Sequence, residues 1–168
     1  METLGQAVHR ACHLTGTFTL RSGQVSGEYF DKYLFESDPR LIRRAAEAMV
    51  ALLPPCDVLG GMEIGGIPLV AVMSQLTGLP AVFVREEAKQ YGTRKVAEGQ
   101  SVNGARVVGV EDVVTTAGAL VNGCGALREA GAIVDSVVCA LDREQGGAQN
   151  LTSHGIALLP ALRRRYVG

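Results

Sequence analysis

Two adjacent carboxylates, Glu111 and Asp112, stand between an apolar run and a segment of small and hydroxyl-bearing residues. The apolar run is Val107-Val108-Gly109-Val110, and the acids are followed by Val113-Val114-Thr115-Thr116-Ala117-Gly118-Ala119. Backbone N–H groups at the start of a helix, joined by threonine hydroxyls, form a cradle for a phosphate. The carboxylates would repel a phosphate, but they suit ribose hydroxyls or a divalent cation. The segment therefore predicts a ligand with a sugar and a phosphate; the plainer alternative is a strand end with solvated acids and an ordinary turn.

The elements that must position this segment alternate between strands and helices. Helices are predicted at 3–14, at 38–53, up to about residue 76 and from about residue 120, and strands at 18–20, 28–31, 58–61, 81–84, 106–110, 133–141 and, as a last edge strand, 156–159. Continuous Val-rich strands joined by helices indicate a parallel sheet that is covered on both faces. Such sheets bind ligands at the carboxyl ends of their strands. The candidate loops are therefore those after residues 60, 84, 110 and 141.

Composition limits the class of protein. The chain has 168 residues, 47% of them apolar, and a net charge of −1 from 16 Lys and Arg against 17 Asp and Glu. These values predict one soluble domain with a sizeable core, and they argue against a nucleic-acid partner, which requires cations to neutralise phosphates. The sequence shows no signal peptide and no long apolar window, so we expect no membrane contact and a cytoplasmic protein. The four cysteines are far apart and are expected to be reduced thiols.

The acid pair and the turn after it resemble the signature of the type I phosphoribosyltransferases. Four further segments match the orotate phosphoribosyltransferase branch in order, so that the resemblance covers nearly the whole chain: Phe18-Thr19-Leu20-Arg21-Ser22-Gly23, Tyr29-Phe30-Asp31, Arg85-Glu86-Glu87-Ala88-Lys89-Gln90-Tyr91-Gly92-Thr93 and Leu141-Asp142-Arg143-Glu144. The resemblance implies an α/β, Rossmann-like fold with a central parallel sheet, helices on both faces and a small N-terminal hood. Residues 1–36 and part of the C-terminus would form the hood of a single domain, 1–168, whose core is 37–160.

The resemblance also implies an activity and a set of site residues. The activity is the transfer of the phosphoribosyl group of phosphoribosyl pyrophosphate (PRPP) to orotate, a step of pyrimidine biosynthesis. Lys89, Glu111 and Asp112 would be catalytic. PRPP would contact Arg85, Glu86, Lys89, Tyr91, Glu111, Asp112, Val113, Val114, Thr115, Thr116, Ala117, Gly118 and Ala119. The loop of Glu63, Ile64 and Gly65 would bind pyrophosphate, and orotate would contact Arg21, Tyr29, Phe30, Thr115 and Arg143.

A cofactor and a partner follow from the same resemblance. Mg²⁺ would be held mainly by oxygens of the substrate, with no dedicated protein ligands. The polar stretch from Arg85 to Glu98 contains Gly92 and is suited to close over the site and exclude water; its plainer alternative is a solvated loop without a role. Within it, Lys89 would meet the leaving pyrophosphate. We expect a homodimer, with Arg85 as the candidate for sharing across the interface.

Three positions depart from the family's pattern. Glu86 stands where many relatives carry Lys, and Gly65 stands where some bacterial members have a Lys that contacts pyrophosphate. Loss of the first cation would be compensated by residues such as Arg21, Arg94 or Lys95. Ala117 replaces a frequent Gly, a change that is mild at helical φ but costs about 1 kcal/mol or more at positive φ.

Several alternatives stay open on the sequence alone. The chain could serve another nucleobase, although a purine offers no carboxylate for Arg143, or it could be a PRPP-binding regulator without catalysis. Arg143 could instead form a surface ion pair with Asp142 or Glu144. His9 and His13 lie four residues apart on a predicted helix with no acidic partner, and we expect them at the surface or in a subunit contact.

Overall fold

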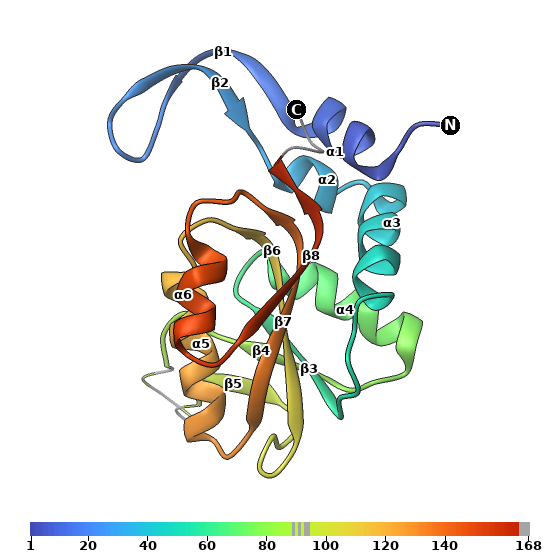
Figure 1. The fold of residues 1–168 in the computed structure, drawn as a ribbon, viewed down its shortest axis with the longest axis vertical. Helices are drawn as coiled ribbons and strands as arrows, with labels where there is room; N and C mark the ends of the chain where they lie inside the picture. Colours follow the sequence, from blue (N-terminus) through green and yellow to red (C-terminus); the bar gives the residue numbers. More distant parts are fainter. Residues whose placement is uncertain (89, 91, 93–94, 165–168) are drawn as a thin grey trace.

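A mixed six-stranded sheet forms the centre of the computed structural model, which describes residues 1–88, 90, 92 and 95–164 (Figure 1). The strand order is β5-β4-β3-β6-β7-β8. Their bounds are β3 Val58–Met62, β4 Ala81–Val84, β5 Ala97–Gly99, β6 Arg106–Val114, β7 Ile133–Asp142 and β8 Ala157–Arg163. All neighbours pair in parallel except β5, which is antiparallel to β4. The predicted α/β class with a central parallel sheet is confirmed.

Helices cover both faces of this sheet (Figure 1). One face carries α3 (Pro39–Val50) and α4 (Gly66–Thr77), and the other carries α5 (Gly118–Glu129) and α6 (Gly147–Ser153). The helix α3 begins as predicted, because the Asp38 side chain accepts hydrogen bonds from the backbone N–H groups of Arg40 and Leu41. Its apolar side then packs on the sheet, burying residues such as Ile42 and Met49.

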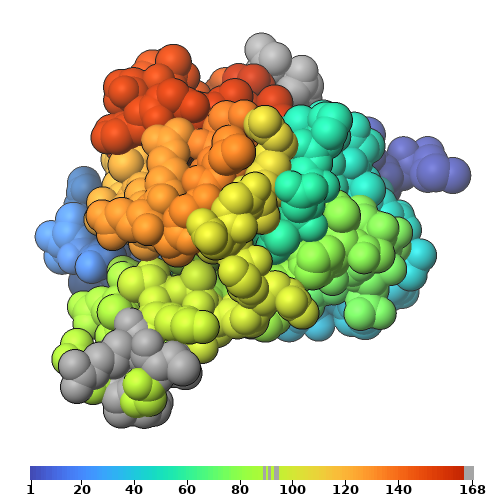
Figure 2. All heavy atoms as spheres, turned by 90° about the horizontal axis from the view of Figure 1, so that it is seen from below, coloured from blue at the N-terminus to red at the C-terminus, as the bar shows by residue number. Residues whose placement is uncertain are grey.

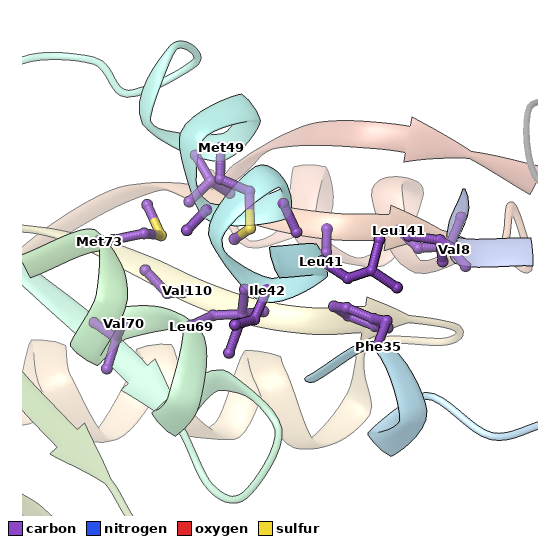
Figure 3. Close-up of a cluster of buried hydrophobic side chains, with 14 of the residues drawn as sticks. Val8, Phe35, Leu41, Ile42, Met49, Leu69, Val70, Met73, Val110 and Leu141 are labelled. Carbon is purple, nitrogen blue, oxygen red and sulfur yellow. The ribbon is translucent and has the colours of Figure 1, made fainter. Parts of the chain in front are cut away.

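The N-terminal segment that we call the hood, residues 1–36, lies beyond the carboxyl ends of the parallel strands (Figure 1). It contains α1 (Leu4–Cys12), the antiparallel pair β1 (His13–Thr19) and β2 (Val25–Phe30), and α2 (Tyr33–Glu36). Figure 3 shows how this segment joins the core: Val8 and Phe35 lie beside Leu41 of α3 and Leu141 of β7. The hood is therefore anchored to the sheet by buried apolar side chains.

Several predicted bounds were wrong. The first helix ends at Cys12, not at residue 14, and the two hood strands are longer than 18–20 and 28–31. The short elements α2, β5 and α6 were not predicted. The main difference concerns β6, which continues through the acid pair to Val114, because Val113 and Val114 still pair with Leu141 and Asp142 of β7. The acids therefore belong to the strand instead of following it.

The end of the molecule opposite the hood is closed by chain turns (Figure 2). The loop before β6, drawn in yellow, lies between the segment around α5 and the segment that leads from α3 to α4. Backbone hydrogen bonds from Gly104 to Gly131 (2.8 Å) and from Asp57 to Arg106 (2.9 Å) tie these turns together. Across the described part of the chain, none of the helices combines the length and the hydropathy that a membrane crossing requires.

Candidate active site

The two acids near the end of β6 have different surroundings. Asp112 is fully buried; its Oδ1 accepts a hydrogen bond from the backbone N–H of Val113 at 2.6 Å, and its Oδ2 lies 2.7 Å from Nζ of Lys32. Glu111 is partly exposed and accepts a hydrogen bond from the backbone N–H of Asp112 at 3.0 Å. Glu111 also lines a small cavity of about 180 Å³. The chain itself therefore engages Asp112, whereas Glu111 faces the space where a ligand would sit.

The charges of this pair depend on burial and on each other. Burial raises the pKa of Glu111 to about 9, and the adjacent Asp112 carboxylate adds to the shift. Burial also opposes ionisation of Asp112, but hydrogen bonds from Glu36, Glu111 and Lys32 outweigh it and hold the pKa of Asp112 below its ordinary value. For Lys32, burial favours the neutral amine, yet the hydrogen bond to Asp112 prevails and raises the lysine pKa. Asp112 and Lys32 thus form an ion pair.

The loop between β3 and α4 passes directly against this ion pair. A Cβ on Gly65 would stand 1.8 Å from Oδ2 of Asp112, and a Cβ on Gly66 would stand 2.3 Å from the Val110 carbonyl oxygen. Both residues must therefore be glycine for the loop to approach so closely. A lysine at position 65 has no room in this arrangement, which gives the departure at Gly65 a physical reason.

The rest of the predicted pyrophosphate loop is more open. Glu63 and Ile64 are exposed, and the Glu63 carboxylate accepts a hydrogen bond from the backbone N–H of Glu86 at 2.9 Å. This bond joins the β3–α4 loop to the start of the charged stretch after β4. The two loops predicted to meet pyrophosphate are therefore in direct contact.

The turn from β6 to α5 contains the predicted phosphate cradle. Thr115, Thr116, Gly118 and Ala119 are exposed, whereas Val114 and Ala117 are buried. The Val114 side chain packs so closely on Gly147 that a Cβ there would stand 2.5 Å from it, so Val114 can offer a ligand its backbone alone. Ala117 precedes α5 with φ 65°, which is the costly case of the two foreseen for this position.

A larger cavity, of about 630 Å³, lies between the hood and the ends of β7 and β8. The guanidinium carbon of Arg143 lies 5.3 Å from the centre of the Phe30 ring, and Tyr29 stacks on Phe18 at 5.5 Å between ring centres. Tyr29, Phe30 and Arg143 all line this cavity. Burial, with a smaller effect of the Arg164 charge, lowers the pKa of Arg143. A flat anionic ligand would find an aromatic face and a guanidinium here.

Arg143, Arg21 and Thr115 lie in different surroundings. Among the ion pairs of the described residues, none joins Arg143 to Asp142 or Glu144: Glu144 pairs with Arg163, and Asp142 accepts a hydrogen bond from the Glu144 backbone N–H. Arg21, predicted to contact orotate, is exposed and is absent from the described lining of the cavity. Thr115 is likewise outside that lining.

One premise about the histidines, that they have no acidic partner, was wrong. His13 does have an acidic partner, because its Nε2 lies 3.4 Å from a carboxylate oxygen of Glu28. The rings of His9 and His13 stack at 4.7 Å between centres, and both line the larger cavity. The sequence concealed this pair, because Glu28 comes from a different strand of the hood.

The charged stretch after β4 is described only in part. Arg85 is partly buried, and its Nε donates a hydrogen bond to the Glu98 carboxylate at 3.1 Å. Arg85, Glu86 and Ala119 line the same small cavity as Glu111, so the structure brings together part of the predicted PRPP set. Lys89, Tyr91 and Arg94 lie outside the described residues.

Two residues of the site, Lys32 and Glu36, were not predicted from the sequence. Lys32 directly precedes α2, and Glu36 is the last residue of α2. Lys32 directly follows the Tyr29-Phe30-Asp31 segment, so a longer reading of that motif would have included it. Glu36 is 8% exposed, at the end of a helix with three aromatic or aliphatic residues. A carboxyl group in such a short apolar helix is the signal that could have indicated it.

A parallel sheet with an acid pair near the end of a central strand, followed by a small-residue turn into a helix, defines the class of type I phosphoribosyltransferases. No family model matches the chain. It is 54% identical to an orotate phosphoribosyltransferase of Nocardioides sp. over 161 residues, which cover 95% of this chain and 90% of that protein.

Solved structures agree with this class. The orotate phosphoribosyltransferase of Mycobacterium tuberculosis H37Rv superposes with a TM-score of 0.87 at 29% identity, covering 98% of this chain and 97% of that one. The same enzyme in complex with PRPP superposes with a TM-score of 0.84 at 26% identity, over 98% and 96% of the two chains. The chain belongs to the orotate phosphoribosyltransferase family.

Proposed function

We propose that the chain transfers the phosphoribosyl group of PRPP to orotate, giving orotidine 5′-monophosphate and pyrophosphate in pyrimidine biosynthesis. Beyond family membership, one observation carries the proposal. The acid pair of β6 and Arg143 after β7 lie at the same end of the sheet, because Val114 pairs with Asp142. A sugar phosphate bound at the acid pair and a carboxylated base bound at Arg143 would therefore lie next to each other.

The PRPP contacts follow from the surroundings of each group. Glu111 accepts hydrogen bonds from the ribose hydroxyls, with Asp112 fixed behind it, and residues 113–119 hold the 5-phosphate through backbone N–H groups and threonine hydroxyls. The loop of Glu63, Ile64 and Gly65 meets the pyrophosphate. Support comes from the small cavity that Glu63, Arg85, Glu86, Glu111 and Ala119 line together.

The orotate contacts rest on the larger cavity. Arg143 presents its planar guanidinium to the orotate carboxylate, while Tyr29 and Phe30 flank the ring. Arg21 and Thr115 complete the proposed set, although neither lines the cavity in this arrangement. The ring nitrogen of orotate forms a bond to C1 of the ribose as the bond from C1 to the pyrophosphate oxygen breaks.

Negative charge develops on the leaving pyrophosphate, so cations must approach it. We assign this role to Lys89 of the stretch 85–98, with Arg85 and Tyr91 as further contacts. Glu86 brings a negative charge to this stretch, and Lys95 or Arg94 supplies the cation that position 86 lacks. The catalytic group is thus Lys89, Glu111 and Asp112.

Mg²⁺ enters with PRPP and supplies positive charge on the pyrophosphate oxygens. Within the part of the chain that the structure describes, no three His, Cys, Asp or Glu side chains gather closely enough to hold a metal ion. The oxygens of PRPP would hold this ion, and the Glu111 carboxyl group at the edge of the small cavity would meet it through water.

The assembly and location stay proposals as well. We propose a homodimer that shares Arg85, supported by the exposed apolar side chains of Ile64 and Phe83 next to this arginine. We further propose that residues 1–36 and part of the C-terminus act as a hood over a single domain with core 37–160, and that the protein works in the cytoplasm.

The test is orotate consumption followed by ultraviolet absorbance. The orotate absorbance should be lost in the complete mixture of protein, orotate, PRPP and Mg²⁺, and should persist when the protein, PRPP or Mg²⁺ is omitted. Orotate that persists in the complete mixture, with PRPP binding intact in calorimetry, would favour another nucleobase or a regulator without catalysis.

A further inference from the structure

Glu36 is a buried carboxyl group in the hood for which the proposed reaction has no use so far. Neither of its oxygens receives a hydrogen bond from a donor among the described residues. The Asp112 carboxylate lies within hydrogen-bonding reach. Two carboxyl groups can form a hydrogen bond with each other only if one of them carries a proton.

The groups that face Glu36 decide which carboxyl carries that proton. They are Lys32 before α2, Glu111 and Asp112 of β6, and the Cys12 thiol of α1. Lys32 is the single cation among them, and its Nζ lies 2.7 Å from Asp112. Asp112 is therefore the ionised member. Burial, together with the hydrogen bond and charge of Asp112, raises the pKa of Glu36 to about 9.

We propose that Glu36 is a positioning residue for PRPP, which as a neutral carboxylic acid donates a hydrogen bond to Asp112 and so fixes the acid pair beneath the hood. The inference rests on the proposed function, because it concerns the same acid pair. Lys32 and the Val113 N–H contact the Asp112 carboxylate, the backbone of Gly65 packs against it, and Glu36 supplies a further hydrogen bond.

In this arrangement the two members of the acid pair have different roles. Asp112 is engaged by the hood and by its own strand, and its fixed backbone N–H in turn orients the Glu111 carboxyl. Glu111 then meets the ribose hydroxyls. Ionisation of Glu36 would add a negative charge beneath a polyanionic ligand, so PRPP affinity should fall as pH rises through about 9. Cys12, whose pKa burial raises to about 11, stays neutral over this range.

The test compares three variants by calorimetry with Mg²⁺ and PRPP. At pH 7.5, Glu36→Ala should weaken PRPP binding by about tenfold or more, because Asp112 loses a hydrogen-bond donor. Glu36→Gln should recover at least about threefold of that loss, because its amide N–H can replace the carboxylic O–H. Above pH 8, the affinity of Glu36→Gln should fall less steeply than that of the wild type. Glu47→Gln, an exposed carboxylate on α3 that pairs with Arg43, is the matched control and should keep the wild-type profile.

A direct measurement keeps the inference separate from the proposed function. In ¹³C NMR of protein labelled at glutamate carboxyls, the resonances that are still protonated at pH 7.5 should include one that is absent from Glu36→Gln; Glu111, whose pKa is also raised, should give a second one that remains. An ionised Glu36 at that pH would overturn the inference, and so would a Glu36→Gln variant that binds PRPP as weakly as Glu36→Ala or keeps the wild-type pH profile. A wild-type protein that binds no PRPP would overturn the proposed function instead.

Discussion

Arg143 lies with its guanidinium carbon 5.3 Å from the centre of the Phe30 ring, at the wall of the larger cavity. If it forms a two-pronged contact with the orotate carboxylate, Arg143→Ala should raise the KM for orotate by about 30-fold or more. The KM for PRPP should change by less than about threefold. Arg143→Lys should recover little of the loss, since an ammonium lacks the planar fork. Initial-rate kinetics with each substrate varied in turn measures both values.

The control for this prediction is Arg40→Ala, which removes an exposed arginine on α3. It should leave both KM values at the wild-type level. An equal rise of the two KM values in Arg143→Ala would indicate that Arg143 holds the fold of the site and does not select the base.

The raised pKa values of the buried carboxyl groups of Glu36 and Glu111 predict how the free energy of unfolding depends on pH. Both have a pKa raised by burial to about 9 in the folded protein, against an ordinary value of 4.5. Between these pH values the folded state binds more protons than the unfolded chain, so the free energy of unfolding falls as pH rises from about 4.5 to about 9. Each such group contributes up to about 1.4 kcal/mol per pH unit.

Urea denaturation at pH 5, 6, 7 and 8 should therefore show a falling stability of the wild type. In Glu36→Gln the slope should be shallower by about one proton, whereas Glu47→Gln should keep the wild-type slope. Equal slopes in the wild type and Glu36→Gln would mean that Glu36 titrates at an ordinary pKa.

At the scale of residues, the sequence identified the groups that stand in order along one strand and its turn. It could not identify groups that reach the site from another element. Lys32 of the hood and Asp112 of the sheet form an ion pair, and the role proposed for Glu36 depends on its burial near Asp112. Neither contact can be read from the order of the residues. Val114 stands in the predicted phosphate cradle with its side chain packed inward on Gly147, so its proposed contact with the phosphate is through the backbone.

Among the elements, α5 begins at an unfavourable backbone position. Ala117 adopts φ 65° immediately before the helix, where glycine has no steric cost. Ala117→Gly should raise the free energy of unfolding by about 1 kcal/mol, measured by urea denaturation. Ala126→Gly inside the same helix is the control and should lower it by about 1 kcal/mol. A loss of stability in Ala117→Gly would show that the buried Ala117 methyl matters more than the φ strain.

The close approach of the β3–α4 loop to β6 gives a second prediction for an element. Gly65→Ala places a Cβ 1.8 Å from the Asp112 carboxylate, so loop or carboxylate must move. We expect a loss of at least about 2 kcal/mol of stability and a PRPP affinity reduced by at least about tenfold. Denaturation and calorimetry measure the two effects. Gly125→Ala on α5, where nothing lies within 4 Å of the added methyl, is the control and should be neutral or stabilising.

The elements that the sequence predicted well were those with long apolar patterns. The strands β3, β6 and β7 each bury several consecutive residues, and β4 buries its two valines, Val82 and Val84. The strand β5 has three residues and no apolar pattern of its own, since it forms by pairing with β4. The end of β6 also escaped prediction, because its pairing with β7 continues past two acids that resemble the start of a loop.

In the whole molecule, the hood and the sheet share one apolar core and one buried ion pair. Phe35 and Val8 pack with Leu141 in that core, and Lys32 reaches Asp112 beside it. The fold class could be predicted because periodicity and family resemblance agreed. The contact between hood and sheet could not, because it joins residues that are 80 to 133 positions apart in the sequence.

The proposed sharing of Arg85 between subunits can be tested on the whole dimer by mixing two impaired variants, Arg85→Ala and Arg143→Ala, at an orotate concentration far below the raised KM of Arg143→Ala. If Arg85 serves the partner's site, a mixed dimer has one complete site, with Arg143 from one subunit and Arg85 from the other. Random pairing of equal amounts makes about half of the dimers mixed, so about a quarter of the wild-type activity should return. If Arg85 serves the site of its own subunit, neither site of a mixed dimer is complete, and activity stays at the level of the separate variants. A monomer in sedimentation with full activity would equally exclude sharing, since each chain would then hold a complete site.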